Sequence, residues 1–322
     1  MSQGKRAREE ALLADRGTSE DNWRLLRDFV TSRESARINK EAGNSRPWTL
    51  DPIIDYNHFC NVYRIDDRVT QWLLKNFYTP IQEMQKEQLG EFCDLWFYAA
   101  MARLINWPPS LEFLLNEGVV PRRISEWDED KFKTTFQVFK DRGDKTFTGA
   151  YMLYNGSRTE RNAEPKTFFT GFSITLLMRH VDDLRLAVAS KSLAKTSEVI
   201  QRVEGISTFL AGQIVADLTY LRGPGSMYDA TDLYTWAPLG PGSQRGLNWL
   251  HLRRPIKKTW KEPEFIKALI EVREQVQPLL PNGKLLSLHD VQNIMCEYSK
   301  YMRIRATGES YRKYVSETAY TV

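Results

Sequence analysis

Three stretches of the 322-residue sequence carry groups that could hold a phosphate. The segment 240–246 (GPGSQRG) is rich in glycine, so its backbone could approach an oxyanion beside Arg245. The tripeptide Gly205-Ile206-Ser207 predicts a tight turn between two short helices, where backbone N–H groups would face a phosphate. The C-terminal block interleaves tyrosines with cations, as nucleic-acid backbone sites do; the cations include Lys300, Arg303, Arg305 and Arg312. Each stretch could instead have a purely structural role: 240–246 as an ordinary turn, the Gly205-Ile206-Ser207 segment as a plain hairpin and the C-terminal block as a solvated helix.

The composition limits the available chemistry to carboxylates, cations and backbone groups. The three cysteines lie far apart and the four histidines lack ligand spacing, so we expect neither a metal site nor an iron–sulfur cluster. No apolar run approaches the roughly 18 residues of a membrane span, and the N-terminus lacks the apolar core of a secretory signal. The formal net charge is only +4, yet residues 251–322 hold 13 Lys+Arg against 8 Asp+Glu, so charge suited to DNA lies near the C-terminal end.

Helices must position these groups, because apolar residues recur at helical spacing from about residue 68 onward. We therefore predict an all-α fold of about ten helices, with only 146–153 resembling a strand. A charged arm (1–32), with a short helix around Trp23–Val30, would precede a helical domain of one or two lobes (33–314) and a tail (315–322). The predicted helical segments are 69–77, 92–105, 110–118, 128–141, 166–189, 197–203, 209–221, 264–277 and 287–301.

The segment 203–218 resembles the helix-hairpin-helix of DNA repair glycosylases, with Ser207 in place of the second glycine of the turn. The resemblance implies a glycosylase-like helical fold and a catalytic aspartate beyond the hairpin. Asp229 lies 24 residues after Gly205, and Asp232 is the second candidate. Phe209 occupies the place of the lysine nucleophile of the lyase members, so Schiff-base strand cleavage is not implied.

Three further blocks, Arg46–Leu73, Thr231–Asn248 and Cys296–Tyr314, extend the resemblance over about residues 33–314. With the hairpin they resemble the bacteriophage thymine-hypermodification family, described as alpha-glutamyl/putrescinyl thymine pyrophosphorylases and as amino acid:DNA transferases. A sister group is the helical domain of 5-hydroxymethyluracil DNA kinases, which also carry a P-loop domain. The sequence has no P-loop signature, which favours the transferase branch.

The resemblance implies transfer of an amino acid, glycine being one candidate, or of another amine to 5-phosphomethyl-2′-deoxyuridine in phage DNA, with loss of phosphate. The partners would be modified DNA and a free amine in the cytoplasm of the infected host, without a cofactor or a metal. The base must leave the stack, the phosphate needs cations, and the amine proton needs a carboxylate, first Asp229 and then Asp232. The implied phosphate- and substrate-binding residues are Arg46, Asn61, Arg64, Arg68, Gly242, Ser243 and Arg245, and the stacking candidates are Trp48, Tyr63, Tyr151 and Trp236.

Several alternatives stay open at this point. Cys60 could add to the pyrimidine ring, although a buried thiol without a chemical role is the stronger interpretation. Asp67 and Asp51 could be ion-pair scaffolding, and Asp217 falls inside the second hairpin helix, where a structural role is expected. The competing functions are a pyrophosphorylase acting on 5-hydroxymethyluracil in DNA, a monofunctional glycosylase and a DNA-binding module without catalysis.

Overall fold

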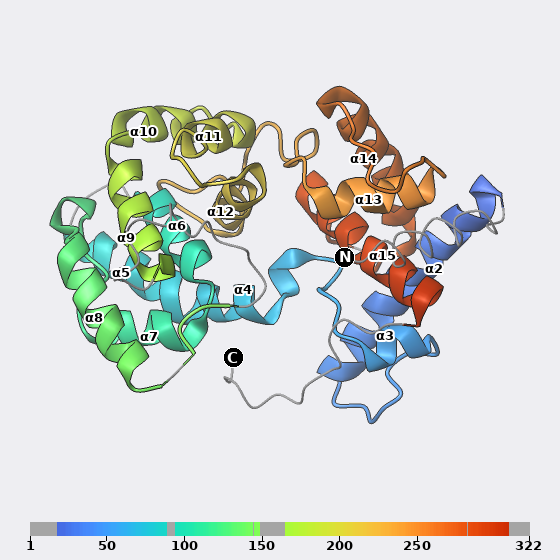
Figure 1. The fold of residues 1–322 in the computed structure, drawn as a ribbon, viewed down its shortest axis with the longest axis horizontal. Coiled ribbons are helices and arrows are strands. Elements are labelled where there is room, and N and C mark those ends of the chain that lie inside the picture. The colour runs from blue at the N-terminus through green and yellow to red at the C-terminus, as the bar shows by residue number, and fades with distance from the viewer. Residues whose placement is uncertain (1–17, 89–93, 144, 149–164, 282, 309–322) are drawn as a thin grey trace. The chain divides into compact units, whose positions relative to one another are not determined.

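The computed structural model describes residues 18–88, 94–143, 145–148, 165–281 and 283–308 (Figure 1). Throughout these residues the regular elements are helices and no β-strand occurs, so the predicted all-α fold is confirmed. No helix in these ranges is long and apolar enough to cross a membrane. The described residues divide into two compact units: unit 1 combines residues 18–67 with 233–308, and unit 2 lies within 68–232.

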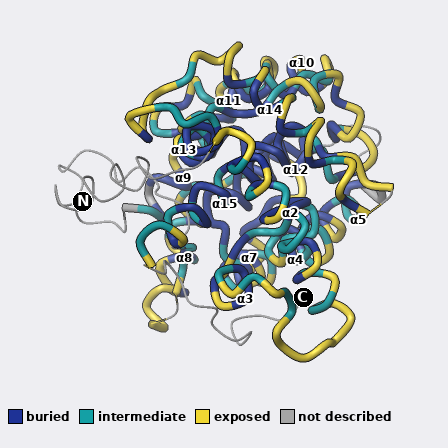
Figure 2. Tube along the Cα trace, turned by 90° about the vertical axis from the view of Figure 1, so that its right-hand side faces the viewer, coloured by how far each residue is buried: buried dark blue, intermediate teal, exposed yellow. Residues whose placement is uncertain are grey.

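Unit 1 is built around α15 (Leu288–Thr307), most of which is buried (Figure 2). The helix begins at a capping box formed by Ser287 and Asp290 and ends at Gly308, whose φ of 66° suits glycine. Four further helices pack against it: α2 (Ser19–Glu41), α3 (Pro52–Tyr56), α13 (Pro241–Leu250) and α14 (Glu262–Val276).

The close approach of α13 to α15 depends on two glycines. A Cβ atom at Gly246 would collide with the carbonyl O of Met295, and one at Gly242 would collide with Sγ of Cys296. Because the interior is close-packed, any larger residue would push the two helices apart. The expected loop conformation at 240–246 is therefore wrong, since this segment begins α13 and its glycines permit helix packing.

Helix α2 is longer than the predicted segment around Trp23–Val30. A capping box at Thr18 starts it. Near its other end Arg37 pairs with Glu34 and with Glu41, one turn away on either side, at 2.5 Å each. The helix therefore runs to Glu41, and the boundary expected between residues 32 and 33 falls within it.

A buried ion pair holds the centre of unit 2. Arg103 on α6 (Leu95–Ile105) pairs with Asp217 on α12 (Thr208–Tyr220), and both side chains are almost fully buried. Tyr78 donates to the same carboxylate at 2.5 Å, and Arg103 also donates to Oγ1 of Thr70 at 3.2 Å. The buried carboxylate is thus well supplied with donors, as burial of a charge requires, and Asp217 has a structural role.

The remaining elements of unit 2 are α4 (Arg68–Leu73), a π-helical turn (Leu74–Tyr78), α5 (Thr79–Gln88), α7 (Pro108–Asn116), a 3-10 turn (Ile124–Glu126), α8 (Glu129–Asp141), α9 (Pro165–Met178), α10 (Val181–Ala189) and α11 (Leu193–Ile200). The single helix predicted at 166–189 is thus two helices. The N–H groups of Arg179 and His180 bond to carbonyls three residues back, a tighter turn that ends α9. Of the strand-like segment 146–153, residues 146–148 form no strand and the others lie outside the described residues.

Replacing Gly246 by Ala should destabilise the protein by about 2 kcal/mol or more, because a backbone atom of α15 blocks the added methyl group. The measurement is the free energy of unfolding in urea. Gly171→Ala is the matched control, since this glycine is also helical but its added Cβ would meet a side-chain atom of Phe132 at 3.1 Å, which has to shift by only a few tenths of an ångström. Helix propensity alone favours alanine at both positions by up to about 1 kcal/mol, so equal effects would contradict the packing argument.

Candidate functional site

Residues from all three sequence blocks meet around one polar cluster in unit 1. The chain from 57 to 67 has little regular structure apart from a 3-10 turn at Arg64–Asp66. Most members of the cluster are half-buried, so protein surrounds them while each keeps some contact with solvent, and Arg64 is 8% exposed. We use the name polar cluster for Arg33, Cys60, Asn61, Arg64, Asp67, Cys296, Glu297 and Lys300.

Hydrogen bonds from α2 and α15 fix the backbone of this segment. Arg33 of α2 donates to the carbonyl O atoms of Phe59 and Cys60, at 3.1 and 3.0 Å. It also donates to Oδ1 of Asn61. From the other side, the N–H of Cys60 donates to Oε2 of Glu297 at 3.0 Å. One guanidinium and one carboxylate therefore hold three successive residues in place by charge-assisted bonds.

Helix α15 contributes polar residues that recur every three or four positions and so share one face. They are Asp290, Asn293, Glu297 and Lys300. Asp290 accepts the backbone N–H of Arg64 at 2.9 Å, and Asn293 accepts from Nη1 of Arg64 at 3.0 Å. Lys300 donates to the carbonyl O of His58 and, at 3.3 Å, to Glu297. Because of the helical repeat, the polar residues on this face of α15 all contact the segment from 58 to 64.

Asp67 is a carboxylate whose proton affinity is tuned towards neutral pH. Its Oδ1 accepts the backbone N–H of Asn61 at 2.7 Å. Burial raises the pKa of Asp67 to about 6, although Arg64, the Asn61 N–H and Arg33 act to lower it. A carboxylate with such a pKa can accept a proton and release it again at physiological pH, as a general base must.

The two thiols of the polar cluster are poor nucleophiles. Burial raises the pKa of Cys296 to about 11 and that of Cys60 well above its ordinary value, and the charge of Glu297 adds to both shifts. Both thiols therefore stay protonated at neutral pH, and only the thiolate attacks. This argues against addition of Cys60 to a pyrimidine ring.

Three cations act electrostatically on the polar cluster. The charges of Arg245, Arg64 and Lys300 all act to lower the pKa of Cys296, so Arg245 of α13 lies within electrostatic reach of the cluster. Together with Asn61, these are the predicted binding residues that the structure brings together. Arg46 and Arg68 are exposed outside the cluster, the first on the loop after α2 and the second at the start of α4.

Sequence reasoning gave Asp67 no more than a scaffolding role, and it attached no chemistry to Arg33 or Glu297. The burial that raises the pKa of Asp67 comes from α2 and α15, which lie far from it along the chain. One signal was available: the run RIDDR from Arg64 places two carboxylates and two cations in a block otherwise rich in apolar residues.

The two predicted catalytic aspartates lie in unit 2, beside the start of α11. Asp229 is exposed and pairs with Lys191 at 2.8 Å, and this hydrogen-bonded ion pair lowers the pKa of its carboxyl group. Asp232 accepts the N–H groups of Leu193 and Ala194 at 2.8 and 3.0 Å. Its carboxylate therefore caps α11, whereas Asp229 stays open to solvent. A catalytic role for either stays a prediction.

The predicted hairpin is present, because α11 and α12 pack together across a short turn. Gly205 in that turn has a φ of 86°, which favours glycine. Ser207 caps α12 by accepting the N–H of Leu210 at 3.2 Å, and Ile206 is buried. Ile206 anchors the turn while Gly205 and Ser207 keep solvent contact, so a phosphate contact here stays a prediction.

Other predicted contacts are buried in the core. Tyr63 is 3% exposed and its hydroxyl donates to the carbonyl O of Lys284 at 3.0 Å. Contrary to the prediction, its ring therefore cannot stack on a base. Ser243 is fully buried and donates to the carbonyl O of Gly240 at 2.9 Å. Gly242 faces Cys296. Binding of phosphate by Gly242 and Ser243 stays a prediction.

The other predicted residues vary in exposure. Arg303 is half-buried and Arg305 exposed near the end of α15. Trp48 and Trp236 are both half-buried. The candidates Arg312 and Tyr151 lie outside the described residues.

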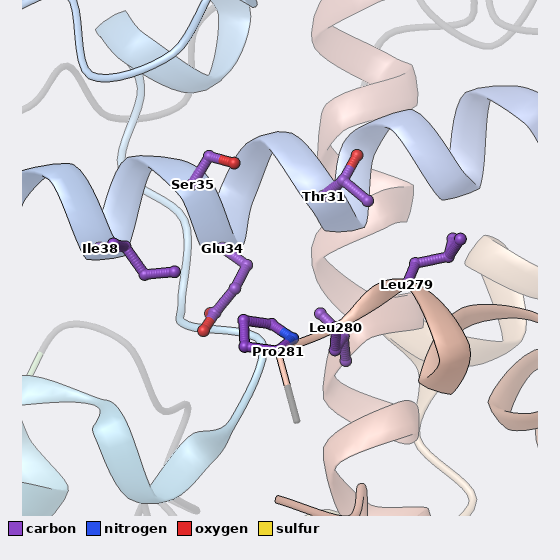
Figure 3. A pocket seen from close by; sticks show the side chains of 7 residues that line it. All are labelled: Thr31, Glu34, Ser35, Ile38, Leu279, Leu280 and Pro281. Atoms are coloured by element: carbon purple, nitrogen blue, oxygen red, sulfur yellow. The ribbon is translucent and has the colours of Figure 1, made fainter. Parts of the chain in front are cut away.

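A pocket of about 320 Å³ lies in unit 1 between α2 and the turn that follows α14 (Figure 3). Among the described residues that line it, Glu34 alone is charged, and its side chain extends from α2 towards Pro281. Ile38 and Leu280 contribute apolar walls. The Glu34 carboxylate already binds Arg37 at 2.5 Å, so we assign no ligand to this pocket.

Comparison with known proteins gives a family match and a curated relative. Residues 20–310 match the model of a family described as the helical domain of 5-hmdU DNA kinase. The 5-hmdU DNA kinase of Bacillus phage SP10 is 24% identical over 328 residues, which cover 91% of this chain and 49% of that kinase. The chain thus spans about half the length of the curated relative it matches. No solved structure matches.

These matches bear out the expected relation to phage DNA hypermodification at that general level. The matching family is that of the kinase helical domain, which the sequence analysis gave as a sister group of the transferases. The finer assignment to the transferases stays a prediction.

Asp67 should make the protein less stable as the pH rises. The folded protein holds the Asp67 proton more tightly than the unfolded chain, since the pKa rises from 3.8 to about 6 on folding. The stabilisation that protonated Asp67 contributes is therefore complete below pH 3.8 and is lost as the pH rises through about 6. Asp67→Asn cannot ionise, so its stability relative to the native protein should increase from about pH 4 to about pH 7 in urea unfolding. A constant difference over that range would contradict this account.

Proposed function

Because this chain belongs to the family of the 5-hmdU DNA kinase helical domain, we propose that it acts on 5-hydroxymethyl-2′-deoxyuridine, or on its phosphorylated form, in bacteriophage DNA. The substrate base must leave the helical stack before any protein group can reach its 5-methylene carbon. The enzyme therefore needs both a DNA-binding surface and a reactive cluster that receives the base.

The reaction we propose is transfer of an amine, glycine being one candidate, to 5-phosphomethyl-2′-deoxyuridine. The amine nitrogen forms a bond to the 5-methylene carbon. The carbon–oxygen bond breaks, and phosphate leaves with its electron pair. An ammonium donor gives up a proton to a base, so the balanced products are the substituted amine and inorganic phosphate. No oxidant, reductant or nucleotide enters this balance.

One observation carries the proposal: the polar cluster combines a proton acceptor with cations. Asp67, with its pKa of about 6, can take the amine proton. Arg64, Arg245 and Lys300 can stabilise the charge on the leaving phosphate. Asp67 replaces Asp229 as our first candidate for the base, because the ion pair that lowers the pKa of Asp229 weakens it as a proton acceptor.

A second reaction, phosphorylation of the hydroxymethyl group, is favoured by the family match and by the name of the phage relative. Asp67 would then accept the hydroxyl proton, and the same cations would face the incoming phosphoryl group. This reaction needs a nucleotide as phosphoryl donor. Amine transfer remains our first choice because the 322-residue sequence contains no P-loop signature to hold one.

Mass analysis of digested nucleosides should distinguish these reactions. The protein is incubated with duplex DNA containing 5-phosphomethyl-2′-deoxyuridine and a mixture of amino acids and diamines, and separately with 5-hydroxymethyl-2′-deoxyuridine DNA and ATP. We expect an amine adduct that has lost phosphate. Phosphate gain in the second reaction would support the kinase, a diphosphate adduct the pyrophosphorylase, and a free base the glycosylase. DNA that is bound but unchanged in both reactions would contradict an enzymatic role.

Asp67→Asn should lower the rate of amine transfer by about 10²- to 10⁴-fold, the usual contribution of a general base. It should also remove the rise of kcat/KM with pH through about 6, since that rise reflects ionisation of Asp67.

Asp229→Asn is the competing variant, and its rate should stay close to that of the native enzyme. A large loss in Asp229→Asn with little loss in Asp67→Asn would return the catalytic role to Asp229. Thermal unfolding of both variants shows whether either loss reflects misfolding.

A further inference from the structure

The loop between α2 and α3, residues 42–51, presents a large apolar side chain to solvent. Leu50 is 98% exposed, and Tyr56, at the end of α3, is 67% exposed. The loop is exposed along most of its length and extends beyond α3 (Figure 1). A lone exposed leucine is ordinary, but one beside exposed aromatic and basic groups indicates an interaction surface.

Trp48, two residues before Leu50 in the chain, is held in place by hydrogen bonds and carries cations over its ring. Its indole N–H donates to the carbonyl O of Asn44 at 2.8 Å, and its own carbonyl O accepts from Nδ2 of Asn39 at 2.8 Å. The guanidinium of Arg46 lies 4.4 Å from the ring centroid, and Nζ of Lys40 lies 5.6 Å from it. Cation–π attraction thus gathers two positive charges on one ring.

The carboxylates of the same segment make internal bonds. Asp51 accepts the N–H of Ile53 and the hydroxyl of Tyr301, both at 2.8 Å. Asp55 is 5% exposed and accepts the N–H of Trp48 at 2.9 Å. Arg46 is exposed and Lys40 half-buried over the indole ring, and Glu41 beside Lys40 pairs with Arg37, so the net charge that this segment offers to a partner is positive.

Helix α15 adds another cation beside the loop. Tyr301 bonds to Asp51, and Arg305 lies one turn further along the helix. Burial raises the pKa of Tyr301 to about 12, and a hydrogen bond with Arg305 acts against this shift. Arg305 is exposed and therefore extends the positive surface from the loop onto α15.

We propose that this surface binds a DNA duplex and inserts Leu50 between base pairs. Cations attract the phosphate backbone and release its counterions, while an inserted apolar side chain unstacks neighbouring bases. Asp51 caps α3 directly after Leu50, which fixes the backbone that carries the inserted side chain. The positive charge and the internal bonding of both carboxylates favour DNA over a protein partner. We name the DNA surface as Lys40, Arg46, Trp48, Leu50, Tyr56 and Arg305.

A duplex containing the fluorescent base 2-aminopurine tests the insertion directly, because this base brightens when it is unstacked. We expect the native protein to raise the fluorescence and Leu50→Ala to remove most of that rise. Leu285→Ala, at a leucine that is 62% exposed elsewhere in unit 1, is the matched control and should behave like the native protein. Equal fluorescence for the native protein and both variants would overturn the insertion of Leu50.

Salt dependence tests the cations separately. In anisotropy titrations, Arg46→Gln and Lys40→Gln should each reduce the slope of log Kd against log salt by about 1, the amount expected for one lost phosphate contact. Unchanged slopes would overturn the DNA surface. Binding to a single strand as tightly as to the duplex, without a change in fluorescence, would also overturn it.

This inference concerns binding and requires no chemical step, so its test is independent of the reaction proposed above. Loss of unstacking in Leu50→Ala would support the surface even if no modified nucleoside were formed. If the Leu50→Ala variant transferred the amine at the native rate and also gave the native fluorescence, the proposed reaction would be supported and the proposed DNA surface would be contradicted.

Discussion

The set of charges that acts on the polar cluster depends on how closely α13 can approach α15. Gly246 lies against the backbone of Met295, and Gly242 lies against Cys296, so the two helices pack at a distance that no side chain would allow. At this distance α13 carries Arg245 into electrostatic reach of Cys296. A steric constraint between two backbones thereby decides which charges act on the cluster.

Two carboxylates of this protein are enclosed by different groups. Asp217 in unit 2 is surrounded by donors from Arg103 and Tyr78, an arrangement that fixes a charge and holds helices together. Asp67 in unit 1 is also desolvated, but its supporting donors do not offset the loss of water, so its proton affinity rises. The first carboxylate acts as a structural anchor, and the second is able to exchange a proton.

The sequence predicted the features that depend on local pattern and not those that depend on tertiary packing. The all-α class, the hairpin around Gly205 and the amphipathic α8 follow from periodicity and capping residues, which act over a few positions. The segment 240–246 looked like a loop because glycine signals a turn equally well, and only the backbone of α15 shows why it is helical. Asp67 was undervalued for the same reason, since its desolvating neighbours are remote in the chain.

The contacts made by the polar face of α15 depend on the spacing of its residues along the helix. Asp290, Asn293 and Glu297 all meet the segment from 60 to 64 because three or four residues, about one helical turn, separate each from the next. Inserting or deleting a single residue between them would rotate everything beyond it by about 100° around the axis. A substitution on this helix would therefore remove one contact at a time, whereas a change in residue number would have to be three or four residues, about one turn, to keep the polar face in place.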